Sequence, residues 1–574
     1  MVTCVHVTHE AVEQSGGIGT VLRGLIVARA YQERVERTIL LGPLPSAAAG
    51  GQADVPGLEV WFDSLRGAGA APAAAALAQV ASFYGVRLVH GRRLLGSDGR
   101  EAWAEVLMVD VGRPHRREDE FKYYLYERFG LDSRRYEANS EYELFLRLAD
   151  PGVEAVRALL GDSGEPCWLI AHEFMGLCTV LRAILGGDRR FRTAFYAHEV
   201  ATARLVIEHG PGRDLAFYQV LRLARRTGGY LADHFGAHDW FYKHALVSRA
   251  WRCDAVLAVG DWVVEELRFL GPEFAGRAID VVYNGIPRAA ASGPERRQAR
   301  ARLRQFAAAL LGWEPDWVFT HVTRLVRSKG LWRDLLVLRH LDARLAAAGQ
   351  RAVLLVLASA AGPRPGGEVW RMAGEYGWPL AHREGYPDLT SGELDFDLLV
   401  RRFNASAVAV RVVFLNQFGF GRASCGPAVP EAMSFADLRL GTDAEFGQSL
   451  YEPFGIAVLE PLSSGAVCVA SDVCGCVGFA RRVLAGRPCS NLVAGEYASL
   501  SAEVDLAAAH ALGPADCARV EAAAAARVAA HLAAQLPRTP QEQQLLWRQG
   551  QELASAMSWE KVVRDMLVPA LRLG

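Results

Sequence analysis

The stretch YEPFGIAVLEPLSSGAVCVASD, from Tyr451 to Asp472, decides the fold of the C-terminal half of this 574-residue chain. Its start, Glu452–Gly455, reads as a tight turn, and the apolar run after it reads as a helix. Residues 466–470 then have the composition of a buried strand. Turn, helix and strand in this order are typical of an α/β unit with a parallel sheet, and Glu452 is expected at the mouth of the turn.

Two glutamates, Glu452 and Glu460, lie in this stretch with seven residues between them. On one continuous helix Glu460 would lie two turns further along, on roughly the same face as Glu452, where it could accept hydrogen bonds from two vicinal hydroxyls. Gly455 allows the backbone to approach a ligand at a helix start whose N–H groups point outward. The spacing alone is equally compatible with two solvated helix carboxylates.

A second segment, HVTRLVRSKGL from His321 to Leu331, places two cations beside a predicted helix start. Arg324 ends a strand, and Lys329 follows five residues later. Two permanent positive charges at a helix N-terminus suit a diphosphate. Taken without other evidence, the pattern is also that of an ordinary solvated surface.

Both halves of the chain alternate short β-rich runs with helical segments, which predicts two doubly wound parallel sheets. The expected strands are 4–8, 38–41, 106–111, 168–171, 194–197, 255–259 and 280–282 in the first half, and 318–323, 353–358, 410–415 and 466–470 in the second. The linker NGIPRAAASGP, Asn284 to Pro294, separates them. We therefore predict domains over 1–286 and 295–545, followed by a C-terminal helix, 546–574, with an apolar stripe. The tract 416–448 is predicted to be a loop at the edge of a cleft.

Glycines and histidines follow the early strands, at the sheet edge where ligands of parallel sheets bind. The turn EQSGGIGT, Glu13–Thr20, contains Gly16, Gly17 and Gly19, which suit a close backbone approach to phosphate but equally an ordinary tight turn. Two turns hold histidine, at His172 and His198. His6 and His9 are expected to be ordinary structural histidines.

Together these motifs resemble retaining glycosyltransferases of the GT-B fold, close to bacterial glycogen and starch synthases. The resemblance implies two Rossmann-like domains with a cleft between them, the first on the acceptor side and the second binding a nucleoside diphosphate sugar. It also implies that the 546–574 segment crosses back to the first domain. The chain departs from the family at Gln14, where glycogen synthases commonly have lysine, and at Gln448–Ser449, where Pro-Ser is common.

The resemblance assigns roles to individual residues. Glu452 would contact hydroxyls of the transferred sugar, with Arg324 and Lys329 on the pyrophosphate and His198 on the sugar, while His172 would shape the site. Around the donor, the implied contacts are the glycine loop and the second-domain motif: Gly16, Gly17, Gly19, Phe454, Gly455, Ile456 and Glu460. The nucleotide sugar, a UDP-glucose or ADP-glucose type of donor, is then a substrate, and no separate cofactor is implied.

Composition restricts the other possibilities. With 63 basic and 64 acidic side chains, no basic excess is available for holding nucleic-acid phosphates. The start MVTCVHVTHE lacks signal-peptide features, and ten scattered cysteines fit a reducing compartment, so a cytoplasmic protein without an integral membrane segment is expected. No metal is expected: Cys474-x-Cys476 has no second pair, and the D-x-D of Asp395 and Asp397 reads as a helix start.

The expected reaction is transfer of a hexosyl unit, most plausibly glucosyl, to an α-glucan or related acceptor. Three alternatives remain at this point. The chain could transfer to a lipid or small-molecule acceptor, or be a sugar-nucleotide epimerase that needs no acceptor. It could also be a catalytically silent glycan-binding protein, although a silent protein has no need to keep all four of Arg324, Lys329, Glu452 and Glu460.

Overall fold

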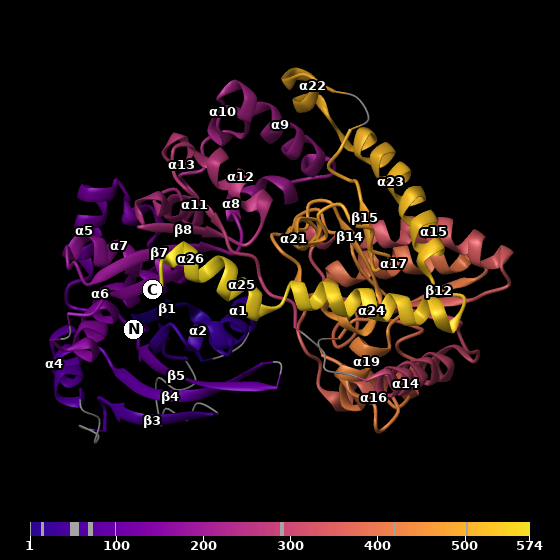
Figure 1. The fold of residues 1–574 in the computed structure, drawn as a ribbon, viewed down its shortest axis with the longest axis horizontal. Helices are drawn as coiled ribbons and strands as arrows, with labels where there is room; N and C mark the ends of the chain where they lie inside the picture. Colours follow the sequence, from indigo (N-terminus) through magenta and orange to yellow (C-terminus); the bar gives the residue numbers. More distant parts are fainter. Residues whose placement is uncertain are drawn as a thin grey trace. The chain divides into compact units, whose positions relative to one another are not determined.

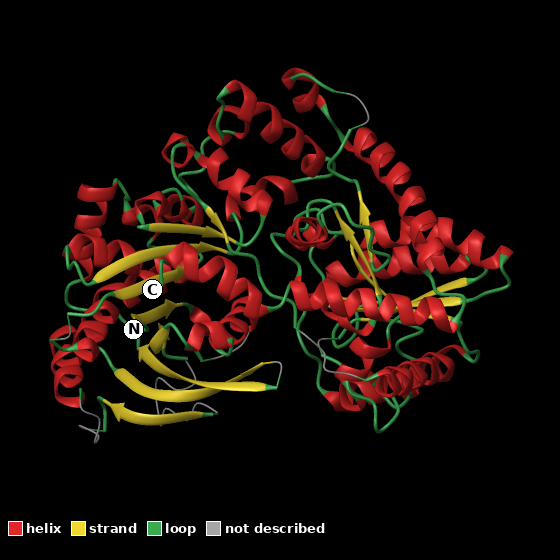
Figure 2. Ribbon diagram, viewed as in Figure 1, coloured by secondary structure: helices red, strands yellow, loops and turns green. Residues whose placement is uncertain are grey.

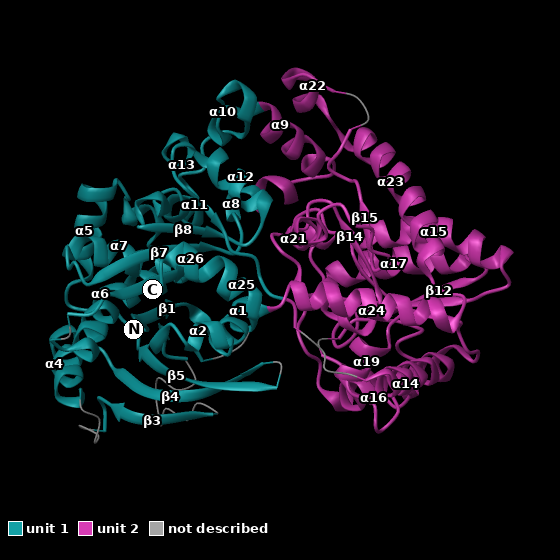
Figure 3. Ribbon diagram, in the orientation of Figure 1, with its two compact units in different colours: residues 1–203, 224–285, 559–574 teal, residues 204–223, 286–558 magenta. Residues whose placement is uncertain are grey.

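The computed structural model describes residues 2–12, 16–45, 57–66, 73–97, 99–162, 164–287, 292–417, 419–500 and 503–573. The chain forms two compact units (Figure 3). Unit 1 contains residues 1–203, 224–285 and 559–574, and unit 2 contains residues 204–223 and 286–558. The units thus divide at 285/286 and 558/559, whereas the predicted boundaries were 286/295 and 545/546, and residues 204–223 leave the first half of the sequence to join unit 2.

Unit 1 is built on a mostly parallel sheet flanked by helices (Figures 1 and 2). Its strand order is β3-β4-β5-β2-β1-β6-β7-β8-β9. The strands are β1 (Val2–Val7), β2 (Val35–Pro43), β3 (Leu58–Asp63), β4 (Leu88–Ser97), β5 (Arg100–Val109), β6 (Cys167–His172), β7 (Phe191–Ala197), β8 (Ala255–Ala258) and β9 (Asp280–Val281). Helices of this unit include α1 (Gly17–Ile26), α2 (Arg29–Gln32), α4 (Ala74–Tyr84), α5 (Glu118–Phe129), α6 (Ser140–Leu160), α7 (Leu177–Gly186) and α12 (Asp261–Leu270).

One edge of this sheet departs from the predicted parallel arrangement. β4 pairs antiparallel with both β3 and β5, and β5 then returns to parallel pairing with β2. Neither β3 nor β4 was predicted from the sequence, because β4 reads LVHGRRLLGS and lacks the regular alternation of a half-buried strand. The parallel part of the sheet, β5-β2-β1-β6-β7-β8-β9 in spatial order, matches the doubly wound prediction.

The sheet of unit 2 is parallel in every pairing of the described strands, in the order β12-β11-β10-β13-β14-β15. Its strands are β10 (Trp317–Arg324), β11 (Ala352–Ser359), β12 (Val410–Leu415), β13 (Ala444–Gly447), β14 (Val467–Ser471) and β15 (Leu492–Gly495). The flanking helices include α14 (Gly293–Leu311), α15 (Leu331–Ala347), α16 (Gly366–Tyr376), α17 (Ser391–Ser406), α19 (Phe435–Gly441), α21 (Gly475–Leu484), α23 (Pro514–Gln535) and α24 (Pro540–Ala556).

Alternation along the buried central strand β11 explains why this sheet needs helices on both faces. Leu354 and Val356 belong to one buried apolar cluster, which includes residues of α15 and α23. Val353 and Leu355 belong to a second, which includes residues of α14 and α16. Because neighbouring strand residues point to opposite faces, a strand apolar at every position must be covered on both sides. The prediction of two doubly wound α/β domains is therefore confirmed.

The tract 416–448 is not merely the loop that the sequence predicted. It contains α18 (Arg422–Cys425), α19 and β13, and β13 lies next to β10 in the middle of the sheet. Its sequence, AEFG, is short and carries the fully buried Glu445, so it lacks the usual signature of a strand.

Residues 546–556 belong to α24 of unit 2, whereas α25 (Trp559–Val562), a π-helical segment (Val563–Leu567) and α26 (Val568–Leu571) belong to unit 1. The indole of Trp559 is buried against two glycines, where a Cβ on Gly24 would lie 2.1 Å, and one on Gly285 2.5 Å, from its ring. The carboxylate of Glu560 accepts hydrogen bonds from the backbone N–H groups of Arg29 and Ala30, at 2.9 and 3.0 Å. It thereby caps α2.

None of the helices in the described ranges combines the length and apolarity needed to cross a membrane.

Candidate active site

The strand order of unit 2 reverses between β10 and β13, and the predicted donor residues follow these two strands. In such sheets, ligands bind beyond the carboxyl ends of the strands at the point of reversal. Arg324 is the last residue of β10, and Glu452 comes five residues after the end of β13 at Gly447. Two segments that are about 120 residues apart in sequence thus meet where this fold places ligands.

Lys329 and Glu452 form an ion pair at this edge. The side chains are 17% and 18% exposed, so the charges are largely but not wholly removed from water. The loops that carry them are held together because the N–H groups of Leu450 and Tyr451 donate to the carbonyl of Ser328, at 2.7 and 3.3 Å. The sequence placed both residues at a donor site and did not predict that they would neutralise each other.

Gly330 permits this close approach of the two loops. It has φ +61°, and a Cβ at this position would lie 2.7 Å from the carbonyl oxygen of Gln448. A larger residue would therefore be strained and would also separate the loops. In contrast to Lys329, the side chain of Arg324 is exposed and makes no polar contact with the part of the chain that the structure describes.

Glu460 is held separately, by Arg439. The guanidinium of Arg439 forms ion pairs with Glu460 at 3.0 Å and with Glu445 of β13 at 2.9 Å. Burial alone would lower the pKa of Arg439, but the two carboxylates together raise it above its ordinary value. Burial raises the pKa of Glu445 despite the opposing effect of Arg439. Sequence reasoning missed Arg439, because nothing in its local pattern distinguishes it from a surface arginine.

The expectation that Glu452 and Glu460 lie on one helix face is wrong. Glu452 lies before the helix, α20 covers only Ile456–Leu459, and Glu460 opens a 3₁₀ turn, Glu460–Ser464. The helix starts at Gly455, whose φ of +90° places it in the left-handed region. A Cβ on Gly455 would lie 2.9 Å from Cγ of Glu452, so glycine here leaves room for the glutamate side chain. The donor-binding roles predicted for Phe454, Gly455 and Ile456 stay predictions.

Buried polar side chains next to the loops of Lys329 and Glu452 form hydrogen bonds and ion pairs that hold these loops in place. Arg333 is 1% exposed and bonds Asp214 at 2.6 Å, Glu521 at 2.7 Å and the carbonyl of Ser449 at 3.2 Å. Gln448 donates to Asp334 at 2.9 Å and accepts from the hydroxyl of Tyr497 at 2.5 Å. Proline at position 448 would have no amide to make either contact, which gives the departure from the family's Pro-Ser a structural role here.

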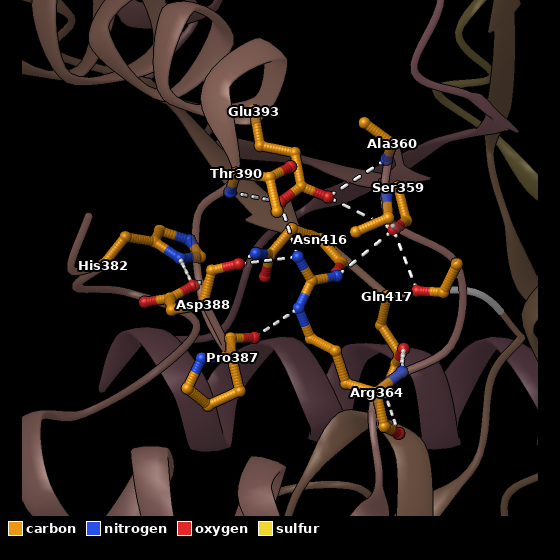
Figure 4. A network of polar contacts seen from close by, with 12 residues as sticks. Ser359, Ala360, Arg364, His382, Pro387, Asp388, Thr390, Glu393, Asn416 and Gln417 are labelled. Carbon is orange, nitrogen blue, oxygen red and sulfur yellow. Dashed lines mark hydrogen bonds and ion pairs between the residues drawn. The ribbon is translucent and has the colours of Figure 1, made fainter. Parts of the chain in front are cut away.

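A second buried network, shown in Figure 4, lies beyond the carboxyl ends of β11 and β12. Its centre is Arg364, which is 4% exposed and forms an ion pair with Glu393 at 2.5 Å. The same guanidinium donates to the carbonyls of Pro387 and Asp388, at 2.5 and 2.6 Å. Burial would raise the pKa of Asp388, but the hydrogen bond that its carboxylate accepts from His382 at 2.9 Å, with other donors, lowers it below its ordinary value. These bonds fix the loops beside β10.

The D-x-D motif lies within α17, as predicted for a helix start. Thr390 and Glu393 form its capping box, Asp395 is exposed, and Asp397 is buried and paired with Arg401 at 2.6 Å. No group of three or more His, Cys, Asp or Glu side chains placed to hold a metal ion occurs among the described residues.

In unit 1, three histidines form a continuous buried chain beyond the carboxyl ends of β1, β6 and β7. His6 Nδ1 lies 2.8 Å from His172 Nε2, and His172 Nδ1 lies 2.8 Å from His198 Nε2. Burial lowers the pKa of His6 and of His198 to about 3. Burial, together with the neighbouring rings, takes the pKa of His172 well below its ordinary value. The rings are therefore neutral, and His6, expected to be merely structural, belongs to the same chain as His198.

Glu173 fixes the turn that carries His198. It has φ +63° and ψ −169°, a conformation that is costly for a residue other than glycine. Its carboxylate accepts from the backbone N–H groups of His198 and Glu199, the latter at 2.6 Å. Burial and the Glu199 carboxylate raise the pKa of Glu173 well above the usual range.

The glycine loop already holds an anionic group from the chain itself. The carboxylate of Glu10, which is 4% exposed, accepts from the N–H groups of Gly16 at 3.1 Å and Gly19 at 2.8 Å. Gly17 is the first residue of α1. The two amides that were expected to face a donor phosphate thus donate to Glu10 in this structure, and sequence gave no signal for the contact. Gln14 lies outside the described residues.

No protein-family model matches the chain, and no curated protein sequence matches it. Solved structures do match over its whole length. A UDP-forming trehalose-phosphate synthase from Burkholderia xenovorans, in complex with glucose-6-phosphate, has 12% identity and a TM-score of 0.49, covering 100% of this chain and 99% of that one. A sucrose-phosphate synthase from Thermosynechococcus elongatus has 15% identity and a TM-score of 0.48 (100% and 98% covered). The catalytic domain of starch synthase IV from Arabidopsis thaliana, bound to ADP and acarbose, has 14% identity and a TM-score of 0.47 (100% and 99% covered).

Proposed function

We propose that this chain is a retaining glycosyltransferase that moves a hexosyl unit, most plausibly glucosyl, from a nucleoside diphosphate sugar to a glycan acceptor. The observation that carries the proposal is the ion pair of Lys329 with Glu452 at the β10/β13 reversal point, next to Arg324, whose side chain has no polar partner among the described residues. The two cations at that edge suit the diphosphate of such a donor, and the Glu452 carboxylate suits the free hydroxyls of its sugar.

In the proposed reaction, the bond between the anomeric carbon and the diphosphate oxygen breaks, and the acceptor oxygen bonds to the same face of the anomeric carbon. The acceptor's proton passes to the departing diphosphate, so no side-chain nucleophile is needed. Arg324 and Lys329 would stabilise the charge that develops on the diphosphate, and Glu452 would orient the sugar. Glu460, anchored by Arg439, would accept hydrogen bonds from the ribose of the nucleotide.

The proposed reaction does not require a divalent metal ion to balance the charge of the diphosphate. Arg324 would face the departing diphosphate, and so would Lys329 once Glu452 turns from it to the sugar, and we propose that transfer is independent of divalent metal. His198 in unit 1 is proposed to contact the transferred sugar. The proposed acceptor is an α-glucan or a related glycan.

A two-step experiment tests the proposal. Thermal shift against UDP-, ADP- and GDP-sugars identifies the donor, since a ligand at about 100 times its Kd stabilises by roughly 2.7 kcal/mol. Product analysis with and without acceptor then separates transfer from epimerisation. Glu452→Ala is expected to abolish transfer and to retain nucleotide binding, whereas Glu460→Ala weakens nucleotide binding. If no sugar nucleotide stabilises the protein, the donor site is wrongly assigned.

A further inference from the structure

The three-histidine chain of unit 1 ends on a buried tyrosine. Tyr31 Oη lies 2.9 Å from His6 Nε2 and also receives a hydrogen bond from Thr38 Oγ1 at 3.2 Å. Tyr31, His6 and His172 are each at most 1% exposed, whereas His198 at the other end is partly exposed. The chain therefore runs from the protein interior to the turn after β7.

Counting protons limits this chain to two arrangements. Three neutral imidazoles carry three N–H protons on six nitrogens, and each of the two ring-to-ring contacts requires exactly one proton. The third proton is therefore either on His6 Nε2, facing Tyr31, or on His198 Nδ1, at the outer end. The protonation of all three rings is coupled, because a change at one end reverses every bond between them.

The surroundings of Tyr31 select between the two arrangements. If His6 Nε2 were the donor, Tyr31 Oη would accept from both His6 and Thr38, and its own proton would have only the neighbouring buried thiol of Cys4 to interact with. Sulfur is a weak acceptor, and an imidazole nitrogen is a good one. Tyr31 thus donates to His6 Nε2, and the whole chain is directed outward.

We propose that this chain holds His198 as the neutral Nδ1–H tautomer, and that Tyr31, His6 and His172 are positioning residues for it. Within the described residues, His198 Nδ1 has no polar partner. In the Nδ1–H tautomer this nitrogen is a hydrogen-bond donor left free by the described residues. The tautomer is fixed by Tyr31, which lies at the other end of the hydrogen-bonded chain. The ligand part of the inference rests on the proposed function, in which this N–H donates to a hydroxyl oxygen of the transferred sugar.

The tautomer is tested on the full-length, ligand-free protein labelled with ¹⁵N-histidine. Long-range ¹H–¹⁵N spectra distinguish protonated from bare ring nitrogens, and the signals of His198 are those that disappear in His198→Gln. We expect a protonated Nδ1 and a bare Nε2 at His198. A protonated Nε2 with a bare Nδ1, or an imidazolium at neutral pH, overturns the proposal.

Tyr31→Phe tests the origin of the tautomer. Removing the hydroxyl donor should give His198 a mixture of tautomers, whereas His340→Gln, at an exposed histidine outside the chain, should leave the His198 signals unchanged. An unchanged tautomer in a folded Tyr31→Phe variant refutes the role of Tyr31. If that variant does not fold, the wild-type spectrum alone still decides the tautomer.

Turnover measurements test the proposed hydrogen bond from His198 Nδ1–H to the transferred sugar. Tyr31→Phe should lower turnover in proportion to the share of His198 that leaves the Nδ1–H tautomer, about twofold for an equal mixture, with little change in KM for the donor. Among monodeoxy donor sugars, one should show no difference between the variant and the wild type, because it lacks the hydroxyl that His198 contacts. An equal loss with every deoxy sugar overturns the sugar contact. If instead the protein proves to have no transferase activity, the spectra remain a valid test of the tautomer.

Discussion

The ion pair between Lys329 and Glu452 gives the sharpest test of the site, because its loss affects stability and activity in different ways. Each residue is replaced by an uncharged side chain of similar size, Lys329→Met and Glu452→Gln, and the two changes are combined. Removing one member of a fully buried pair costs about 3–5 kcal/mol, because the remaining charge is left unpaired. With side chains 17% and 18% exposed, water compensates part of this cost. We expect about 2 kcal/mol for each single variant.

The double variant separates the pair from its surroundings. Because no unpaired charge is left, its loss should be smaller than the sum of the two single losses, with a coupling of about 1–2 kcal/mol. Hydrogen exchange read by mass spectrometry on peptides of β10 and α15 reports opening of unit 2 alone, which avoids treating a two-unit chain as a two-state system. Arg327→Met, at an exposed neighbouring cation, is the matched control and should cost less than about 0.5 kcal/mol.

The loss of turnover should not parallel the loss of stability in these variants. Each single variant, and the double variant, is expected to lose about a hundredfold or more in turnover, since both side chains are proposed to contact the donor in the transition state. A coupling below about 0.3 kcal/mol would show that the two charges do not pair in the free protein. Normal turnover in either single variant would instead remove that residue from the proposed site.

Three further outcomes are expected. Trp559→Ala should cost unit 1 about 3–5 kcal/mol by hydrogen exchange, because the indole is 3% exposed, whereas Trp240→Ala, at 66% exposure, should have little effect; equal losses would contradict the packing. EDTA and Asp395→Asn should each leave the rate nearly unchanged, and restoration of an EDTA-inactivated enzyme by magnesium or manganese would refute metal independence. Because the folded pKa of Asp388 lies below its ordinary 3.8, its stabilisation is present above that value and is lost as pH falls through the folded pKa. Asp388→Asn should therefore destabilise unit 2 at pH 7, and the difference from wild type should shrink below about pH 4 when opening of unit 2 is measured by hydrogen exchange; a difference independent of pH would rule out the ionised carboxylate.

The sequence predicted those parts of the fold that repeat a strong local pattern. β11 is apolar at nearly every position, so it was expected within one residue of its bounds. β13 could not be predicted, since its four residues include a buried glutamate whose neutralising partner, Arg439, acts through space. The antiparallel edge at β4 was missed for the related reason that its pairing depends on neighbouring strands.

The candidate site was predictable as a set of residues but not as a set of contacts. Arg324, Lys329 and Glu452 were identified from short motifs, and the sheet order brings those motifs to one edge. Their partners were not identified, because the contacts join segments with no local relation: Lys329 to Glu452, and Gly19 to Glu10. Glu452 and Glu460 were predicted to lie on one helix. The left-handed conformation of Gly455 instead separates Glu452 from the helix that follows.

The return of the C-terminal segment has a consequence for biosynthesis. Unit 1 lacks part of its core until residue 559 has been made, because the indole of Trp559 fills the surface over Gly24. While the ribosome translates 286–558, the nascent N-terminal portion has no indole over Gly24 and Gly285 and no Glu560 carboxylate at the start of α2. This part of unit 1 can therefore be completed only after residues 559–573 have been translated, and a premature stop within 286–558 leaves a chain whose first unit is unfinished as well.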